Sequence, residues 1–341
     1  MKRLICALLL LSMVLSGCAE QAASEKKQYT ATFLTLFDTV TSIVGKADSE
    51  EAFKAIAQSI HDELLEYHQL FDIYNDYDGL NNLKTINDNA GIEPVKVDQR
   101  IIALLKDCKA YFEATDGKVN AAMGSVLQLW HEVRNDGMDD PANAYLPDMT
   151  ALEEASAHTD FSAVIIDETA STVYITDPAV RLDVGAIAKG WSVQRVCESA
   201  PAGLLISVGG NVCATGPKDE TGTPWVVGIQ NPEGGDNYLH TLSVTGGSVV
   251  TSGDYQRAYM VDGKIYHHII DPETLYPSTY WRSVTIVCAD SGLADALSTA
   301  LFLRPREEGQ QLLNKFDAKA MWVDQKGNIF YSPGFEALIR T

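Results

Sequence analysis

The chain of 341 residues is long enough for one large or two modest domains, and its 46% apolar and 9% aromatic residues are sufficient for a buried core. Its 26 Lys and Arg against 46 Asp and Glu give a formal net charge of -20, which repels nucleic acid and anionic lipid surfaces, so we expect no nucleic-acid partner. An anionic ligand would therefore need a local cation, from a basic side chain or a bound metal ion.

The first residues predict a bacterial export signal. Lys2 and Arg3 precede an apolar run that ends at Leu15, and this run is shorter than the roughly 20 apolar residues that span a membrane. Small residues then lead into Cys18, as in a lipobox, where the Cys becomes the lipidated first residue of the mature protein. An ordinary signal peptide cut at another bond is the alternative.

The small, polar residues after Cys18 are typical of a tether between a lipid and a domain. We predict a signal peptide over residues 1–17, a lipidated Cys18 and tether over 18–28, and one domain over 29–341. This organisation predicts an exported protein. A lipid such as palmitate would anchor it to the outer face of the cytoplasmic membrane, or to the periplasmic side in a cell with two membranes.

The first half of the chain is expected to be rich in helices. Residues 30–44 mix β-branched and aromatic residues, which is typical of a strand, with a bend at Phe37 and Asp38. Apolar residues at three- and four-residue spacing predict amphipathic helices over 49–71 and 98–114.

Three further segments complete this half. The polar residues 75–91 predict a loop, and the apolar residues 119–133 predict a core helix. Thr150 followed by Glu153 has the spacing of a capping box at the start of a short helix.

After Phe161 the pattern changes to alternating strands, interrupted by helices over 188–198 and 293–303. Asp262 followed by Gly263 predicts a hairpin turn. No repeat, Pro-rich tract or second linker divides the chain. The sequence therefore predicts an α+β fold, a single mixed domain with a helix-rich first half and a sheet-rich second half.

Four cysteines lie beyond the predicted lipidation site, and no CxxC motif occurs. They stand in apolar segments, so buried thiols and disulfides are equally compatible with the pattern. They are Cys108, Cys197, Cys213 and Cys288.

Residues 283–303 run from a strand into a helix that carries a pair of hard oxygen donors. Asp295 and Thr299 stand four residues apart and therefore share one face of the helix. A carboxylate and a hydroxyl at this spacing can bind one Mg²⁺, because this ion prefers oxygen and keeps positions for water and substrate phosphate. The alternative is an Asp favoured by the helix dipole and a Thr that only fills a packing position.

The stretch RLDVGAIAKGW, residues 181–191, predicts a place where a ligand phosphate can bind. Asp183 ends a strand, small residues at 185 and 186 let the backbone approach a ligand, and Lys189 begins a helix whose free N–H groups face anions. Lys189 supplies a point charge for phosphate, and Asp183 can accept from a ribose or flavin N–H. A surface Lys beside an Asp cap is the alternative. The stretch is neither a GxGxxG fingerprint nor a P-loop.

His267 and His268 close the hairpin that contains Asp262 and Gly263. Adjacent residues of a strand face opposite sides, so we expect at most one of the two rings in a given cleft. The HxxxH spacing of a metal site is absent. A half-buried His at a sheet edge is the alternative interpretation.

In order and spacing, LDVGAIAKGW, ISVGGNVCATG, HHIIDPETLYP and ADALSTALF resemble the ApbE-type FAD:protein FMN transferases. The resemblance extends to LFDIYND near residue 71 and to ATDGKVNAAMGSVLQLW at 114–130, so it covers nearly the whole mature chain. It implies the mixed α+β fold of that family.

The resemblance also implies a reaction. Family members cut FAD at its pyrophosphate with Mg²⁺ and pass FMN to the Thr (or Ser) hydroxyl of a target protein through a phosphoester bond, releasing AMP. An exported FAD pyrophosphatase that gives FMN and AMP, and a non-catalytic flavin-binding lipoprotein, are the alternatives. The implied acceptor is an exported domain of a redox-pump subunit.

Site residues follow from the same resemblance. The metal ligands would be the side chains of Asp295 and Thr299 and the main-chain carbonyl of Ala186. His268 would be the polar group nearest the phosphates, and with Asp183 and Lys189 it forms the predicted catalytic set. Whether Asp183 or a metal-bound water takes the acceptor's proton is left open.

The resemblance places flavin-nucleotide contacts along the whole chain. Many members carry Met at the position of Phe37, and others carry Asp at the position of Asn120, so the charge is absent there. The implied contacts are Phe37, Tyr74, Lys118, Val119, Asn120, Asp183, Lys189 and Ile269.

Overall fold

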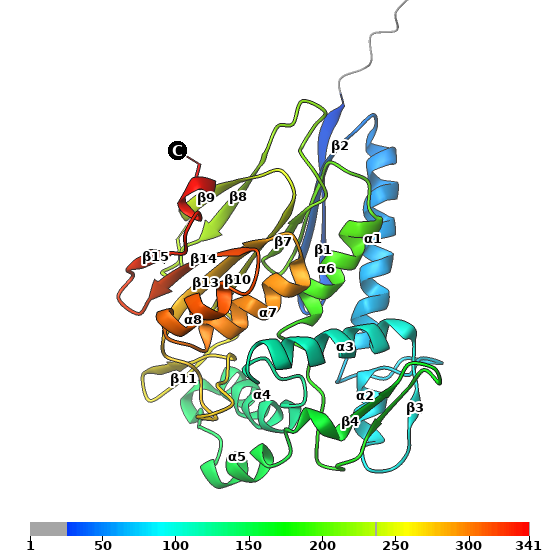
Figure 1. Ribbon diagram of the computed structural model, residues 1–341, viewed down its shortest axis with the longest axis vertical. Helices are drawn as coiled ribbons and strands as arrows, with labels where there is room; N and C mark the ends of the chain where they lie inside the picture. The colour runs from blue at the N-terminus through cyan, green and yellow to red at the C-terminus, as the bar shows by residue number, and fades with distance from the viewer. Residues whose placement is uncertain (1–25, 236, 341) are drawn as a thin grey trace, which may run out of the picture.

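A computed structural model describes residues 26–235 and 237–340 (Figure 1). The predicted lipidation site, Cys18, lies outside these residues. Within them, no helix combines the length and the apolar character needed to cross a membrane.

The scaffold is an eight-stranded sheet whose neighbouring strands are all antiparallel. The β1–β2 hairpin, from the start of the described chain, forms one edge, and strands from the second half form the rest. In sheet order the strands are β1 (Lys27–Leu36), β2 (Thr39–Ala47), β6 (Leu204–Val208), β7 (Asn211–Ala214), β10 (Gly247–Gly253), β13 (Trp281–Cys288), β14 (Ala318–Asp324) and β15 (Ile329–Tyr331).

Both faces of this sheet are covered. Successive strand residues point to opposite faces, so Val250 packs in the large core beneath the helices and Val249 in a second core beneath the β8–β9 hairpin. In Figure 1 the covering helices lie in front of the sheet. These elements are α1 (Glu50–Phe71), α6 (Ala188–Ser199), α7 (Ser291–Phe302), α8 (Arg306–Leu313), β8 (Trp225–Gln230) and β9 (Tyr238–Val244).

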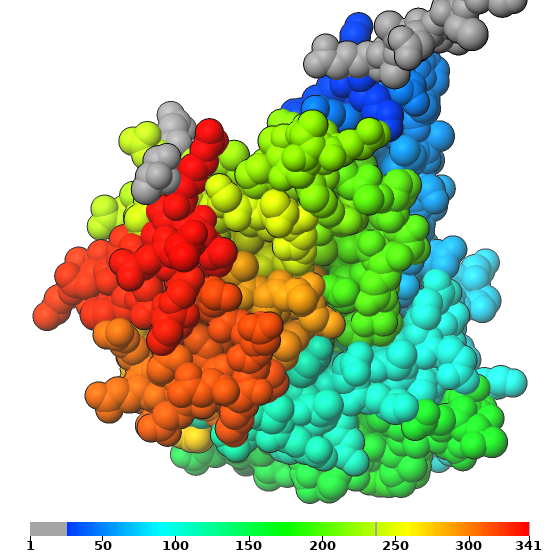
Figure 2. Space-filling view, turned by 45° about the horizontal axis from the view of Figure 1, so that its top comes forward, coloured from blue at the N-terminus to red at the C-terminus, as the bar shows by residue number. Residues whose placement is uncertain are grey.

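The remaining elements form a lower layer below the end of the sheet (Figure 1). In the space-filling view the orange α7–α8 region lies directly against the cyan helices of the first half (Figure 2). The lower layer contains α2 (Leu83–Asp88), α3 (Gln99–Ala114), α4 (Gly124–Asp139), α5 (Met149–Ser156), β3 (Val95–Lys96), β4 (Val164–Asp167), β5 (Thr172–Ile175), β11 (Tyr259–Val261), β12 (Lys264–Tyr266) and the short 3-10 helices Pro141–Asn143 and Phe161–Ala163; a third, Glu336–Leu338, follows β15.

The predicted α+β class is confirmed, and so are the main helices. The predictions that start at Ser49 and Asp98 differ from α1 and α3 by one residue, because these side chains are the N-caps. The hairpin turn at Asp262 and Gly263 is present, with φ of 49° and 77°. All four cysteines for which thiols and disulfides were left open are free in the structure.

The single bent strand predicted over 30–44 is wrong, because the segment is a hairpin. Phe37 and Asp38 both have φ of 52°, and Leu36 pairs with Thr39, so these two residues form the turn between β1 and β2. Two consecutive left-handed residues match the right-handed twist of the flanking strands. The turn carries Phe37 to the rim of the cavity described below.

Two predictions of local structure in the first half need correction. The polar segment 75–91 contains α2, because the Asn82 side chain accepts from the Thr85 N–H while the Thr85 hydroxyl accepts from the Asn82 N–H. The capping box at Thr150 does not form. Asp148 caps α5 instead, since its carboxylate accepts from a main-chain N–H three residues on.

Close packing of α6 against α7 predicts that Gly190→Ala destabilises the protein. An added Cβ would overlap the Ser291 carbonyl oxygen and lie 2.5 Å from Asp295 Cβ. Although Ala is the better helix former, we expect a loss of about 1–3 kcal/mol in the free energy of unfolding, measured by urea titration. Gly246→Ala is the control, because nothing lies within 4 Å of its added Cβ. Equal stability of the two variants would contradict this packing argument.

Candidate active site

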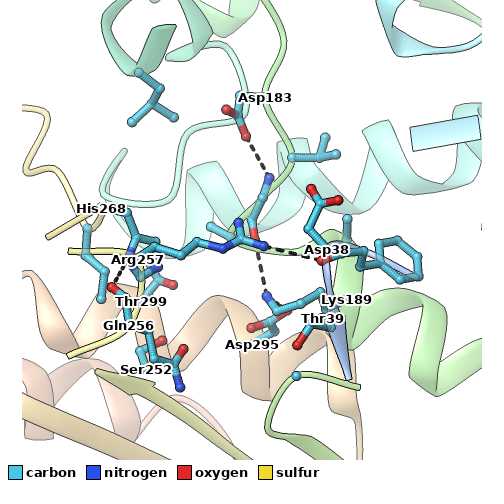
Figure 3. Close-up of a pocket in the computed structure, with 18 of the residues that line it drawn as sticks. Asp38, Thr39, Asp183, Lys189, Ser252, Gln256, Arg257, His268, Asp295 and Thr299 are labelled. Atoms are coloured by element: carbon cyan, nitrogen blue, oxygen red, sulfur yellow. Dashed lines mark hydrogen bonds and ion pairs between the residues drawn. The ribbon is translucent and has the colours of Figure 1, made fainter. Parts of the chain in front are cut away.

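A cavity of about 580 Å³ lies between the helices that cover the sheet and the lower layer. Figure 3 shows part of its lining. The structure brings together every described residue that the sequence predicts for the site. They are Phe37, Tyr74, Lys118, Val119, Asn120, Asp183, Ala186, Lys189, His268, Ile269, Asp295 and Thr299.

The predicted metal ligands meet where the start of α6 faces α7. Asp295 is 4% exposed, and its Oδ2 accepts from the Gly190 N–H at 2.8 Å, with Lys189 Nζ at 3.7 Å. Thr299 lies one turn further along α7 and Ala186 just before α6, and both line the same cavity.

The donor chemistry of these three residues fits Mg²⁺. A carboxylate, a hydroxyl and a main-chain carbonyl are hard oxygen donors, and three protein ligands leave positions for water and phosphate. Across the described ranges, no cluster of three or more His, Cys, Asp or Glu side chains could hold a metal.

The loop before α6 holds Asp183 and Lys189 on one wall of the cavity. Asp183 Oδ1 accepts from the Gly185 N–H at 2.8 Å, and Lys189 Nζ donates to the Gly185 carbonyl at 3.4 Å. Asn87, from the unexpected helix α2, exchanges two hydrogen bonds with the main chain of Leu182 at 2.7 and 2.9 Å. A helix that sequence reasoning missed therefore anchors the predicted phosphate loop.

Two details of this wall differ from the sequence-based expectation. Asp183 does not end a strand of the sheet. Its N–H donates to the Ala121 carbonyl, and only a single parallel bridge joins Arg181 to Met123 nearby. The N–H groups of the first α6 turn are not all free for an anion, because that of Gly190 is bound to a carboxylate of α7.

Of the two neighbouring histidines, only His268 lines the cavity, as predicted. His267 is buried, with Nε2 2.8 Å from the Ser278 carbonyl. His268 Nδ1 lies 3.1 Å from the Gln256 carbonyl, so this nitrogen carries the hydrogen and Nε2 is left as an acceptor. Burial first, and then the charge of Arg257, lower the pKa of His268 to about 3, so the ring is neutral at pH 7.

Two predicted flavin contacts from the lower layer already have partners within the protein. Lys118 Nζ is 2.8 Å from Asp271 Oδ1 and 2.9 Å from Glu273 Oε1, so its charge is neutralised. Asn120 donates to the Thr159 carbonyl at 2.8 Å. These side chains thus border the cavity with strong polar contacts already made.

Phe37 and Tyr74 lie at the opposite rim. The Phe37 N–H donates to His68 Nδ1 at 3.3 Å, and the Tyr74 hydroxyl lies 2.8 Å from His131 Nδ1. Burial, followed by the charge of Asp183, raises the pKa of Tyr74 to about 12, so this phenol stays protonated.

Sequence reasoning missed several polar residues of the lining, notably His131 and Arg134 of α4, and Arg257. From Met123, the N-cap of α4, Leu127 and His131 follow at spacings of four residues, and Arg134 comes three later, so all share the side turned to the cavity. This spacing was visible in the sequence. The surrounding apolar residues made the segment resemble an ordinary core helix.

The sequence model of the ApbE family matches residues 36–322. The chain belongs to the ApbE family. An FAD:protein FMN transferase of Treponema pallidum is 37% identical over 265 residues, covering 72% of this chain and 71% of the relative. One of Klebsiella pneumoniae is 33% identical over 285 residues, covering 80% and 86%.

Solved structures of ApbE proteins share the fold. The crystal structure of the ApbE protein of Thermotoga maritima superimposes with a TM-score of 0.81 at 31% identity, covering 92% of this chain and all of that one. The flavin transferase ApbE of Vibrio cholerae, at 21% identity, has a TM-score of 0.73 and the same coverage of both chains, and shows the fold alone. The fold expected from the motifs is confirmed.

The low pKa of His268 predicts an acid-sensitive stability. An unfolded His has a pKa of 6.5, so between that value and about 3 the unfolded chain binds the extra proton. The free energy of unfolding therefore falls as pH decreases through this window. We expect His268→Gln to reduce the slope of the unfolding free energy against pH by an amount that corresponds to the uptake of up to about one proton. Urea unfolding between about pH 6.5 and 4.5 measures this slope. Parallel curves for the two proteins would contradict the shift.

Proposed function

We propose that this member of the ApbE family is an Mg²⁺-dependent FAD:protein FMN transferase. It passes FMN from FAD to the Thr or Ser hydroxyl of a target protein through a phosphoester bond and releases AMP. The observation that carries this proposal is the convergence of Asp295, Thr299 and Ala186 with Lys189 and Asp183 on one cavity. The names of the relatives support the same activity.

The residues of α6 and α7 fit the charge that this reaction handles. Mg²⁺, when bound, neutralises charge on phosphate oxygens and orients the displacement. Asp295 and Thr299 would hold it with the Ala186 carbonyl. Lys189, 3.7 Å from Asp295, adds a positive charge at the same place. Phosphoryl transfer depends mainly on such positioning and neutralisation.

The acceptor hydroxyl must lose a proton as its oxygen bonds to phosphorus. Asp183, the predicted base, lines the cavity, and so does His268, the polar group predicted to lie nearest the phosphates, which is a second candidate. His268 Nε2 can accept a hydrogen bond from the acceptor hydroxyl, because Nδ1 donates to the Gln256 carbonyl. Negative phosphate charge beside the ring would favour its protonated form and so strengthen it as a base.

The transfer itself is tested with the mature chain, FAD, Mg²⁺ and a candidate acceptor. We expect a fluorescent flavin that stays on the acceptor after denaturation, and its loss on metal chelation. Asp295→Asn and Thr299→Ala should lower the rate on the order of a hundredfold or more, because each removes a metal ligand. Asp48→Asn is the matched control, since this carboxylate is exposed and outside the cavity.

Two other outcomes would overturn the transferase proposal. FMN and AMP released with no label on any acceptor would identify a pyrophosphatase. FAD that co-purifies unbroken with Mg²⁺ present would identify a flavin-binding protein without catalysis.

We also propose that the protein is exported and held at the membrane by lipid on Cys18, where it meets the exported domain of a redox-pump subunit. The LSGC motif at 15–18 supports the anchor. Cys18→Ala should move the protein from the membrane fraction to the soluble fraction of lysed cells and abolish labelling by radioactive palmitate. An unchanged distribution would contradict lipid anchoring.

A further inference from the structure

Two arginines face the cavity without a carboxylate partner. Arg134 comes from α4, and Arg257 from the turn before β11. Within residues 26–235 and 237–340, neither lies within 4 Å of an acidic oxygen, although the chain carries a net charge of -20. Arg100, Arg195, Arg282 and Arg304 form such pairs. Among the described residues Arg181, Arg306 and Arg340 form none either, but they lie outside the cavity.

The two guanidinium groups act on each other and on the same neighbours. Burial, and next the charge of Arg257, lower the pKa of Arg134. Both arginines also oppose the protonation of His131, which lies one turn before Arg134 on α4. Arg134 is half-buried and Arg257 is exposed, and the charge of Asp183 offsets part of their repulsion at Arg134. An anion between the two guanidinium groups would offset it further.

Arg257 is held in place by an unusual backbone. Its φ of 46° is in the left-handed region, which is uncommon for a residue other than glycine. Its guanidinium donates to the Phe37 carbonyl at 3.3 Å, at the tip of the β1–β2 hairpin. Figure 3 shows the side chain extended across the cavity from the side of His268 toward Asp38.

Arg134 is placed by helix periodicity. It shares the cavity face of α4 with His131, whose Nε2 is 3.9 Å from Asp183 Oδ2. The cavity thus holds cations from several separate elements. Lys189 stands at the start of α6 beside Asp295, whereas the two arginines belong to the lower layer and to the turn before β11.

We propose that Arg134 and Arg257 form a phosphate-binding site that holds oxygens of the FAD diphosphate in addition to those bound at Lys189 and the predicted metal ligands. The inference rests on the proposed function, since it takes FAD as the ligand. A planar guanidinium binds two oxygens of a phosphate at once, which a lysine ammonium does not. The pair therefore recognises the phosphate part of the nucleotide and leaves the flavin ring to other residues.

The experiment compares two ligands that share the flavin ring and differ in phosphate. FAD and riboflavin are titrated by fluorescence into the wild-type mature chain, Arg134→Gln and Arg257→Gln, with Mg²⁺ present. We expect each variant to weaken FAD binding about tenfold or more, and to leave riboflavin binding within about twofold of wild type.

Matched variants control for folding and charge. Arg134→Lys and Arg257→Lys keep the charge and lose the paired donors, so we expect FAD affinities between those of the Gln variants and wild type. Arg340→Gln removes an exposed charge outside the cavity and should change neither affinity. Unchanged FAD binding in the Gln variants, or an equal loss for riboflavin, would overturn the proposal.

The same proteins separate this inference from the proposed function. FMN transfer by the wild type is measured in parallel. An absence of transfer together with arginine-dependent FAD binding would refute the transferase and support the arginine site. Normal FMN transfer together with FAD binding that neither Gln substitution weakens would support the transferase and refute the arginine site.

Discussion

The site depends on the contact between the first turn of α6 and the middle of α7. Gly190 has no side chain, so its main chain packs against Ser291 and its N–H reaches the Asp295 carboxylate at 2.8 Å. The hydrogen bond orients this nearly buried carboxylate, and the close approach brings Lys189 and Ala186 to the same place. A larger residue at 190 would separate the two helices and with them the predicted metal ligands.

Charge in the cavity is distributed unequally, and this fits a ligand with several anionic oxygens. Lys118 is neutralised by Asp271 and Glu273, whereas Arg134 and Arg257 have no such partners in the described part of the chain. An acidic protein attracts an anion only through local cations with unused capacity. The local cations belong to different layers of the fold, so a nucleotide between them would connect those layers.

Motifs with local meaning were accessible to sequence analysis. The spacing of Asp295 and Thr299 places them on one helical face regardless of the rest of the fold. In LDVGAIAKGW, Asp183 and Lys189 both bond to the main chain of Gly185, which lies between them in the sequence. Helix α2 was missed because its reciprocal Asn82–Thr85 cap stands in a polar segment with few apolar residues. His131 and Arg134 share a helical face that their spacing shows, but this spacing does not tell whether the face borders a cavity or a core. Arg257 was missed because no local pattern marks it.

By itself, the sequence determined the α+β class, the main helices and the residues of the predicted metal and phosphate sites. Hydrophobic period, helix caps and motif order are local properties, so one sequence is enough to show them. Only the tertiary structure decided that the β1–β2 hairpin joins a sheet made otherwise of strands from the second half of the chain. It also decided that the Gly190 N–H donates to the Asp295 carboxylate, and that Arg134 and Arg257 line the cavity without a carboxylate partner. These features depend on contacts between residues far apart in the chain, and side-chain spacing along one segment carries no information about them.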